Sequence, residues 1–152
     1  MKCSVGSDDS GEVVDAVIRD LLRRGHEVIV YQPEQWPEVD EKVALDVSEG
    51  RADQGVLFCW TGTGTSMAAN KVPGVRAALA WEPWIAEGAR LWNDANVLVM
   101  SFKRTSPEQA LHILDTWLKV EKPDASEAGN IQKLKEMDGR RPRNTASSLR
   151  SE

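Results

Sequence analysis

Short apolar runs alternate with amphipathic stretches along most of the chain. The apolar runs predict β-strands at residues 2–6, 26–31, 54–59, 75–80 and 95–100. The stretches between and after them repeat apolar residues at helical spacing and predict helices at 11–24, 37–50, 66–71, 83–92 and 106–120. Such alternation is typical of a parallel sheet covered on both faces. We therefore expect an α/β fold: a three-layer, doubly wound sandwich of the Rossmann-like or flavodoxin-like kind around a five-stranded parallel sheet.

The pattern changes after Lys122 and Pro123. Residues 125–137 predict one more amphipathic helix, and residues 138–152 are rich in Arg, Ser and Asn. We expect residues 1–137 to form one domain and residues 138–152 to be a disordered tail. A chain of 152 residues is long enough for one domain with a full core.

Composition narrows the class of protein. The net charge of −5 argues against a nucleic-acid partner, because a basic surface would be needed to neutralise phosphates. No apolar run reaches the length that crosses a bilayer, and the first residues read as a strand rather than a signal peptide. Two cysteines cannot form a disulfide framework, and no Cys/His spacing suggests a metal site. We expect a cytoplasmic protein with reduced thiols and no metal or membrane partner.

Two loops that follow predicted strands contain candidate chemistry. In open α/β sheets, ligands bind at the carboxyl ends of the strands. The loop Gly-Ser-Asp-Asp-Ser-Gly at 6–11 offers carboxylates that either bind sugar hydroxyls or a metal, or cap the next helix. The loop at 59–66, Cys-Trp-Thr-Gly-Thr-Gly-Thr-Ser, offers glycine amides to an anion. Cys59, at its start, is either a nucleophile or base, or an inert buried thiol.

The stretch 55–78 resembles the core motif of the type B ribose-5-phosphate isomerases and of the related galactose-6-phosphate isomerase subunits. In that family an apolar strand is followed by Cys-Gly-Thr-Gly-x-Gly-x-Ser and then by Ala-Ala-Asn-Lys-x-x-Gly-Ile-Arg-Ala. Residues 6–11 resemble its Gly-Ser-Asp-His-Ala-Gly segment, and residues 93–98 resemble its Asn-Asp-Ala-Asn-Val-Leu segment. The resemblance extends over roughly residues 2–120, in matching order and spacing.

The resemblance implies an aldose–ketose isomerase that works through an enediolate without metal or cofactor. Cys59 matches the base that moves the proton between C1 and C2. Asp8 and Asn93 match groups that hold substrate. The same resemblance implies that the enediolate oxygen is held by Thr61 and by the backbone of Gly62, Gly64, Thr65 and Ser66. Family members are dimers whose site the partner completes, so we expect a homodimer or a dimer of dimers.

Several site positions depart from the family pattern. Asp9 stands in place of a His, and Trp60 replaces the small glycine after the base. Trp92 replaces the His that opens the sugar ring, and an indole cannot exchange a proton at neutral pH. The two phosphate-binding arginines are replaced by Asn130 and Leu134. Lys103, where another such arginine is common, keeps a positive charge without the bidentate fork of Arg.

These departures leave three interpretations. In the one we favour, the chain is an isomerase acting on an altered sugar or sugar phosphate. Trp60 and Trp92 then line the pocket, and Trp36 and Trp81 are further candidates for its lining. In the second, it is an ordinary ribose-5-phosphate isomerase that binds phosphate through other groups. In the third, it is a non-catalytic relative that binds a sugar-like ligand or serves a structural role.

Overall fold

The computed structural model describes residues 1–139, so the predicted tail lies outside it from residue 140 onward. All neighbouring strands pair in parallel, in the order β2-β1-β3-β5-β4. The strands are Lys2–Ser7 (β1), Glu27–Val30 (β2), Gln54–Cys59 (β3), Ala77–Leu79 (β4) and Val97–Ser101 (β5). The helices are Glu12–Arg23 (α1), Trp36–Ser48 (α2), Thr63–Ala69 (α3), Pro83–Asn93 (α4), Pro107–Lys119 (α5) and Ala128–Glu136 (α6).

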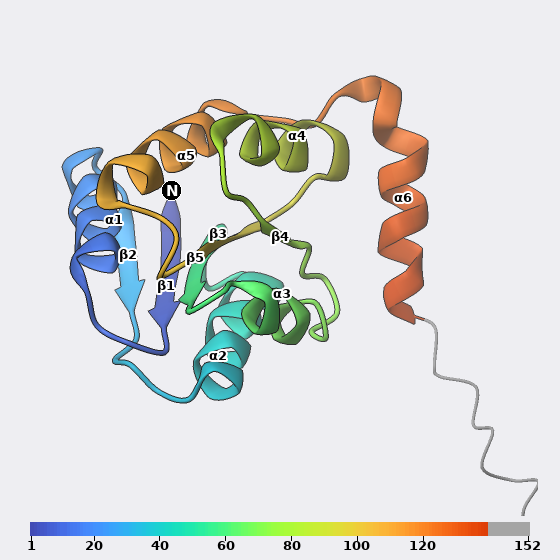
Figure 1. Cartoon of the computed structure of the whole chain (residues 1–152). Helices are drawn as coiled ribbons and strands as arrows, with labels where there is room; N and C mark the ends of the chain where they lie inside the picture. The colour runs from blue at the N-terminus through green and yellow to red at the C-terminus, as the bar shows by residue number, and fades with distance from the viewer. Residues whose placement is uncertain (140–152) are drawn as a thin grey trace, which may run out of the picture.

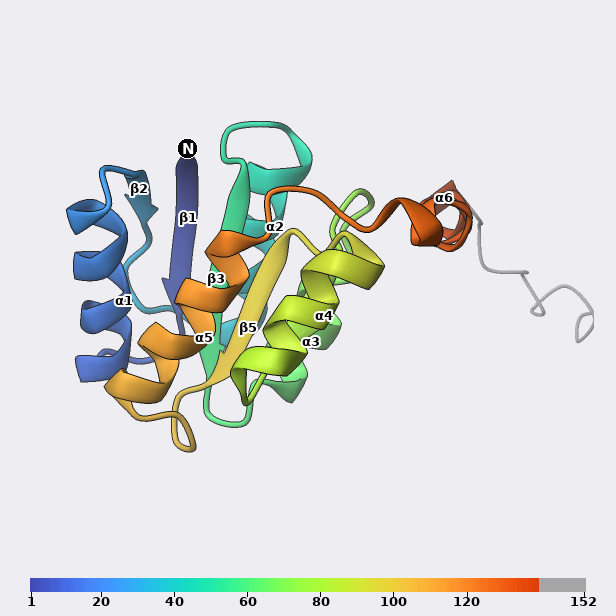
Figure 2. The ribbon, with the colours of Figure 1, turned by 90° about the horizontal axis from the view of Figure 1, so that it is seen from above.

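Two helical layers enclose the sheet, as predicted. Figures 1 and 2 show α1, α5 and α4 over one face and α2 and α3 over the other. The first face buries a large cluster that includes Leu21, Phe58, Met100 and Trp117, and the second buries a smaller one around Val43 and Leu57. The predicted α/β sandwich is therefore confirmed, and it places the ends of β1 and β3 at the centre of one edge.

The boundaries of two elements differ from the prediction. Helix α3 begins at Thr63 rather than at residue 66, because Gly62 adopts a left-handed conformation (φ 83°) that turns the chain directly from β3 into the helix. The predicted strand at 75–80 is shortened to Ala77–Leu79, at the edge of the sheet beyond β5. The predicted start of α5 is confirmed, since Ser106 and Gln109 form a reciprocal capping box.

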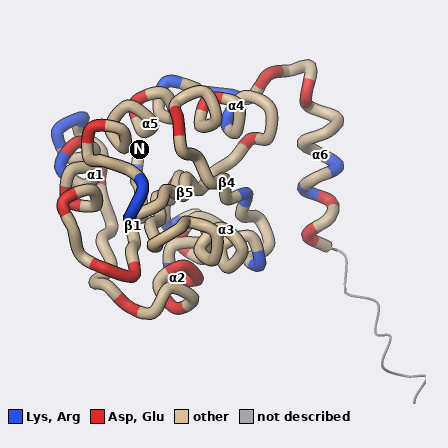
Figure 3. The backbone as a smooth tube through the Cα atoms, in the orientation of Figure 1, with Lys and Arg blue, Asp and Glu red and all other residues tan. Residues whose placement is uncertain are grey.

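Helix α6 stands apart from the sandwich (Figures 1 and 2). Lys135 on this helix pairs with Asp94 at 2.9 Å, and the Asp138 carboxylate accepts a 2.8 Å hydrogen bond from the Gly74 amide. A 3₁₀ turn, Ala125–Glu127, precedes α6 and another, Met137–Gly139, follows it. Figure 3 shows acidic and basic residues mixed along the chain. Within residues 1–139, no helix is both long and apolar enough to span a bilayer.

Candidate active site

Asp8 and Cys59 meet at the carboxyl edge of the sheet. Ser7 in β1 lies directly opposite Phe58 in β3, so the residues that follow them are at the same level. The strand order reverses between β1 and β3, and ligands of open α/β sheets bind where such a reversal occurs. The sequence-predicted loops therefore come together at one place.

A cavity of about 370 Å³ opens at this point, and we call it the Cys59 cavity. Its walls come from the β1–α1 loop, the start of α2, the end of β3 and the first turn of α3. The lining residues are Asp8, Trp36, Cys59, Trp60, Thr61, Thr63 and Gly64. The Cys59 side chain is 6% exposed, so the thiol lies at the bottom of the cavity.

The first turn of α3 presents backbone donors near the Cys59 thiol. The Gly62 amide donates to the Cys59 Sγ at 3.1 Å, and the Thr63 amide donates to the Thr61 hydroxyl at 3.3 Å. The next two amides, of Gly64 and Thr65, have no acceptor among residues 1–139, as is usual for the first turn of a helix. Of these two residues only Gly64 lines the cavity with Cys59, and a free N–H group there is suited to a developing oxyanion.

Aromatic rings and one lysine border the Cys59 cavity. The Trp36 ring packs over Gly64, where an added Cβ would lie 3.5 Å from the ring. Trp60 is 58% exposed, and the Lys103 Nζ lies 4.6 Å from the centroid of its ring. The cation–π contact places a positive charge at the rim of the cavity.

The Asp8 carboxyl is held in a partly buried position. Burial raises its pKa, and the neighbouring Asp9 charge acts in the same direction, whereas its own backbone amide and the Lys103 charge oppose the rise. Its Oδ1 atom is buried and has no hydrogen-bond partner in the described part of the chain. Lys103 is thus close enough to act on Asp8 as well as on Trp60.

Three predicted site residues point elsewhere. Asp9 borders a smaller cavity of about 150 Å³ beside the end of β2, and its carboxylate accepts a 2.8 Å bond from the Ser10 amide. Thr65 is fully buried, backbone included, and does not line the Cys59 cavity. Ser66 borders a separate hollow with Met67 on the outer side of α3.

Trp92 and Asn93 do not reach the Cys59 cavity of their own chain. Each crossover helix of a parallel sheet starts at the carboxyl edge and returns to the amino edge, and both residues lie at the end of α4. The 11 residues of this helix span about 16 Å. The Trp92 ring packs on Gly88 and edge-on against Trp84, with 5.8 Å between ring centroids.

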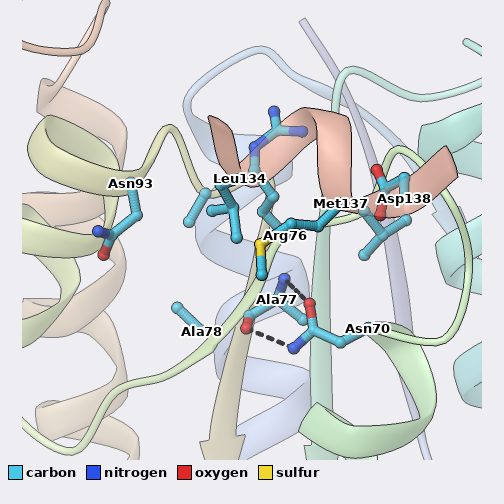
Figure 4. A pocket seen from close by; sticks show the side chains of 10 residues that line it. Asn70, Arg76, Ala77, Ala78, Asn93, Leu134, Met137 and Asp138 are labelled. Carbon is cyan, nitrogen blue, oxygen red and sulfur yellow. Dashed lines mark hydrogen bonds between the residues drawn. The ribbon is translucent and has the colours of Figure 1, made fainter. Parts of the chain in front are cut away.

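Asn93 instead borders a cavity of about 510 Å³ between β4 and α6, which we call the α6 cavity. Figure 4 shows Asn93 on α4, across from Leu134 of α6 and from Met137 of the 3₁₀ turn that follows α6. Asn130, which like Leu134 stands in place of a phosphate-binding arginine, is exposed, and its side-chain amide donates to the Glu127 carboxylate at 2.8 Å. The predicted site residues thus fall into two groups, at opposite edges of the sheet.

Comparison with known proteins gives a consistent result. The sequence model of the ribose/galactose isomerase family matches residues 3–134. The chain belongs to this family. Ribose-5-phosphate isomerase B of Escherichia coli is 34% identical over 146 residues, which make up 92% of this chain and 98% of that protein. D-erythrulose-4-phosphate isomerase of Pectobacterium atrosepticum is 29% identical over 141 residues, 88% of this chain and 93% of that one.

A solved structure supports the same assignment. The structure of Clostridium thermocellum ribose-5-phosphate isomerase B is 38% identical to this isomerase-family chain and aligns with a TM-score of 0.86. The alignment covers 91% of this chain and 97% of the other. The resemblance inferred from the motif at 55–78 is therefore confirmed at the level of family and fold.

Sequence reasoning overlooked two side chains of this isomerase-family site. Thr63 lines the Cys59 cavity, and its hydroxyl lies 2.7 Å from the Thr61 hydroxyl. Asp40, on α2, is fully buried behind the cavity. A signal for Asp40 was available, because it lies among Val39, Val43 and Ala44 on the side of the helix predicted to face the core.

Proposed function

We propose that this isomerase-family chain interconverts an aldose and a ketose, as a sugar or sugar phosphate, with Cys59 as the base. The thiolate takes a proton from the carbon beside the carbonyl group, and the C–H electron pair forms the enediolate double bond. The proton then returns to the neighbouring carbon, and a hydroxyl proton moves between O1 and O2. The product contains the same atoms as the substrate, and no redox partner or metal takes part.

The observation that carries the proposal is that Cys59 lines one cavity together with Asp8 and Gly64, whose amide is free among residues 1–139. The Cys59 thiol, the Asp8 carboxyl and Gly64, whose N–H group is unpaired in this part of the chain, border one cavity. In the proposed reaction the Gly64 amide stabilises the enediolate oxygen. Thr61 and Asp8 hold substrate hydroxyl groups in this scheme.

We propose that the substrate differs from that of an ordinary ribose-5-phosphate isomerase. Trp36 and Trp60 give the cavity apolar walls against which the C–H face of a sugar packs. Lys103 is the cation at its rim, and Leu134 and Asn130 offer no charge to a phosphate. An open-chain substrate, such as the erythrulose 4-phosphate named for one relative, would not need a ring-opening His where Trp92 stands.

We also propose that the working enzyme is a cytoplasmic homodimer, or a dimer of dimers, with a shared site. Trp92 and Asn93 lie too far along α4 to serve the Cys59 cavity of their own chain, so they would serve that of a partner. Trp84 and Trp92 expose a contiguous aromatic surface on α4, 60% and 41% exposed, which a second copy would cover. The free thiols of Cys3 and Cys59 suit a reducing compartment.

The test is proton exchange in deuterated water. The protein is incubated with aldoses and ketoses of four to six carbons, phosphorylated and not, and C1 and C2 are followed by NMR. Exchange that disappears in Cys59→Ala and persists in Cys3→Ala supports the proposal. Substrate binding without exchange in the wild type would favour a non-catalytic sugar-binding protein instead.

A further inference from the structure

A group of buried polar atoms lies behind the Cys59 cavity. Asp40 of α2 and Thr65 of α3 are both 0% exposed, and Asp8 lies on the cavity side of them. Both Asp40 carboxyl oxygens, the Thr65 Oγ1 and the Asp8 Oδ1 are buried without a hydrogen-bond partner among residues 1–139. These three side chains come from three different elements, so the tertiary fold alone brings them together.

Buried polar atoms without partners are costly, and they are rare in folded proteins. Four of the five such side-chain atoms in the described residues belong to this group; the fifth is the Arg90 Nε. The Thr65 hydroxyl faces the Asp40 carboxyl and stabilises its charged form, although it lies outside the geometry of a formed bond. The Asp8 charge also acts on Asp40 and favours its protonated form.

We propose that Asp40 is a positioning residue for Asp8: the two carboxyls share one proton, and the Thr65 hydroxyl donates to the Asp40 carboxyl. The Asp40 O–H then donates to the Asp8 Oδ1, which leaves the Asp8 Oδ2 free to receive a substrate hydroxyl. The pair carries a single negative charge, located on Asp8. In this arrangement every buried oxygen of the group gains a partner.

The electrostatics place the proton on Asp40 rather than on Asp8. Burial raises the pKa of Asp40 to about 7, the Thr65 hydroxyl opposes the rise, and the Asp8 charge adds to it. Burial also raises the pKa of Asp8, against the effect of its backbone amide and the Lys103 charge, but Asp8 borders the cavity whereas Asp40 is fully buried, so Asp8 retains the charge. Asp9 is the other charged group that acts on Asp8. Two interacting carboxyls with unequal surroundings are expected to titrate separately in this way.

The arrangement links the site to pH. Below about pH 7 Asp40 holds its proton and fixes Asp8. Above that pH it becomes a second carboxylate beside Asp8, and the bond that orients Asp8 is lost. The kinetic consequence rests on the proposed isomerase function, whereas the shared proton does not.

The first experiment needs no activity. Aspartate carboxyl carbons are labelled with ¹³C, and the free protein is titrated by NMR, with Asp40→Asn used to assign the Asp40 signal. We expect one carboxyl to titrate near pH 7 in the wild type and to be absent from Asp40→Asn. Titration of every aspartate below pH 5 would overturn the shared proton.

Two neighbouring variants should shift that titration in opposite directions. Thr65→Val removes the donor that stabilises the charged form, so the Asp40 midpoint should rise by about one pH unit or less. Asp8→Asn removes the repelling charge, so the midpoint should fall by a similar amount. Thr105→Val, at a buried threonine that is not among the groups acting on Asp40, should leave it unchanged. An unchanged midpoint in both test variants would contradict the proposed contacts.

The second experiment measures kcat/KM against pH. The wild type should lose activity as pH rises through about 7, whereas Asp40→Asn, which keeps an N–H donor but cannot ionise, should lack this limb. Asp40→Asn should remain within about fivefold of wild type at pH 6, and Asp40→Leu should fall more than tenfold. Superimposable pH profiles of wild type and Asp40→Asn would refute the positioning role, even if NMR shows a carboxyl that titrates near pH 7. If no substrate reacts, the proposed function fails, and the NMR result still decides whether the proton is shared.

Discussion

The Gly62 amide donates a hydrogen bond to the Cys59 Sγ across 3.1 Å. This bond ties the thiol at the end of β3 to the residue immediately before α3. It forms because Gly62 turns the chain through a left-handed conformation immediately after the strand. A position three residues after the cysteine therefore controls where the thiol lies.

Replacing this glycine should damage both stability and the site. In Gly62→Ala the added Cβ would lie 2.5 Å from the Leu79 Cδ1, at a φ that alanine adopts poorly. We expect the free energy of unfolding to fall by about 2–4 kcal/mol, measured by urea denaturation. Gly25→Ala is the matched control, since Gly25 has a φ of 86° but nothing within 4 Å of an added Cβ. Equal losses in both variants would mean that the Leu79 contact has no effect.

Lys103 should discriminate between charged and uncharged substrates. In Lys103→Met the KM for a phosphorylated substrate should rise roughly tenfold or more, with kcat little changed, because a cation at the rim is lost. The KM for the unphosphorylated sugar should stay within about twofold. Steady-state kinetics would check this, with Lys133→Met on α6 as the control. A similar rise for both kinds of substrate would indicate that Lys103 acts only by packing on Trp60.

A shared site predicts recovery of activity on mixing. Cys59→Ala and Asn93→Ala should each be impaired alone, because each removes one half of the site. After exchange of subunits, half of the dimers combine the two variants, and each of these has one intact site. Activity should therefore reach about a quarter of the wild-type value. If activity does not recover in a mixture shown by mass spectrometry to exchange subunits, Cys59 and Asn93 do not act together in a shared site.

The buried Asp40 should make stability depend on pH. Its pKa is raised, chiefly by burial, from 3.8 to about 7, so ionising it in the folded state is unfavourable. Relative to Asp40→Asn, the wild type should lose stability as pH rises from about 4 to 7 and change little above that. The full displacement corresponds to about 4 kcal/mol. Chemical denaturation at pH 4, 5.5 and 7.5 would measure it, and a constant difference between the two proteins would contradict the raised pKa.

Asp46, six residues further along α2, should show the opposite trend. Burial tends to raise its pKa, but hydrogen bonds from Arg51, Ser4 and Tyr31 outweigh burial and lower it. The contribution of a lowered pKa is present above pH 3.8 and disappears as pH falls through the folded-state value. Asp46→Asn should therefore cost about 2–3 kcal/mol at pH 7 and progressively less below pH 4. Thermal melts of both proteins across this pH range would measure the loss of stability. A loss that does not shrink in acid would contradict this account.

Much of the fold and half of the site could be predicted from the chain alone. The apolar runs and helical spacing indicated all five strands and the helices between them, because those patterns reflect burial on a regular backbone. Asp8, Cys59 and Thr61 were expected together, since they lie at or just after the carboxyl ends of parallel strands, which share one edge. The same rule could have separated Asn93, which precedes a strand instead of following one.

The sequence determined the strands, the helices, the family and the residues at the ends of β1 and β3, because these depend on local pattern and motif. Only the tertiary structure decided that Trp36 packs over Gly64, that Lys103 reaches Trp60, and that Asp40 is buried beside Thr65. Those contacts join segments distant in sequence, and periodicity gives the face on which a side chain lies but not the group it meets there.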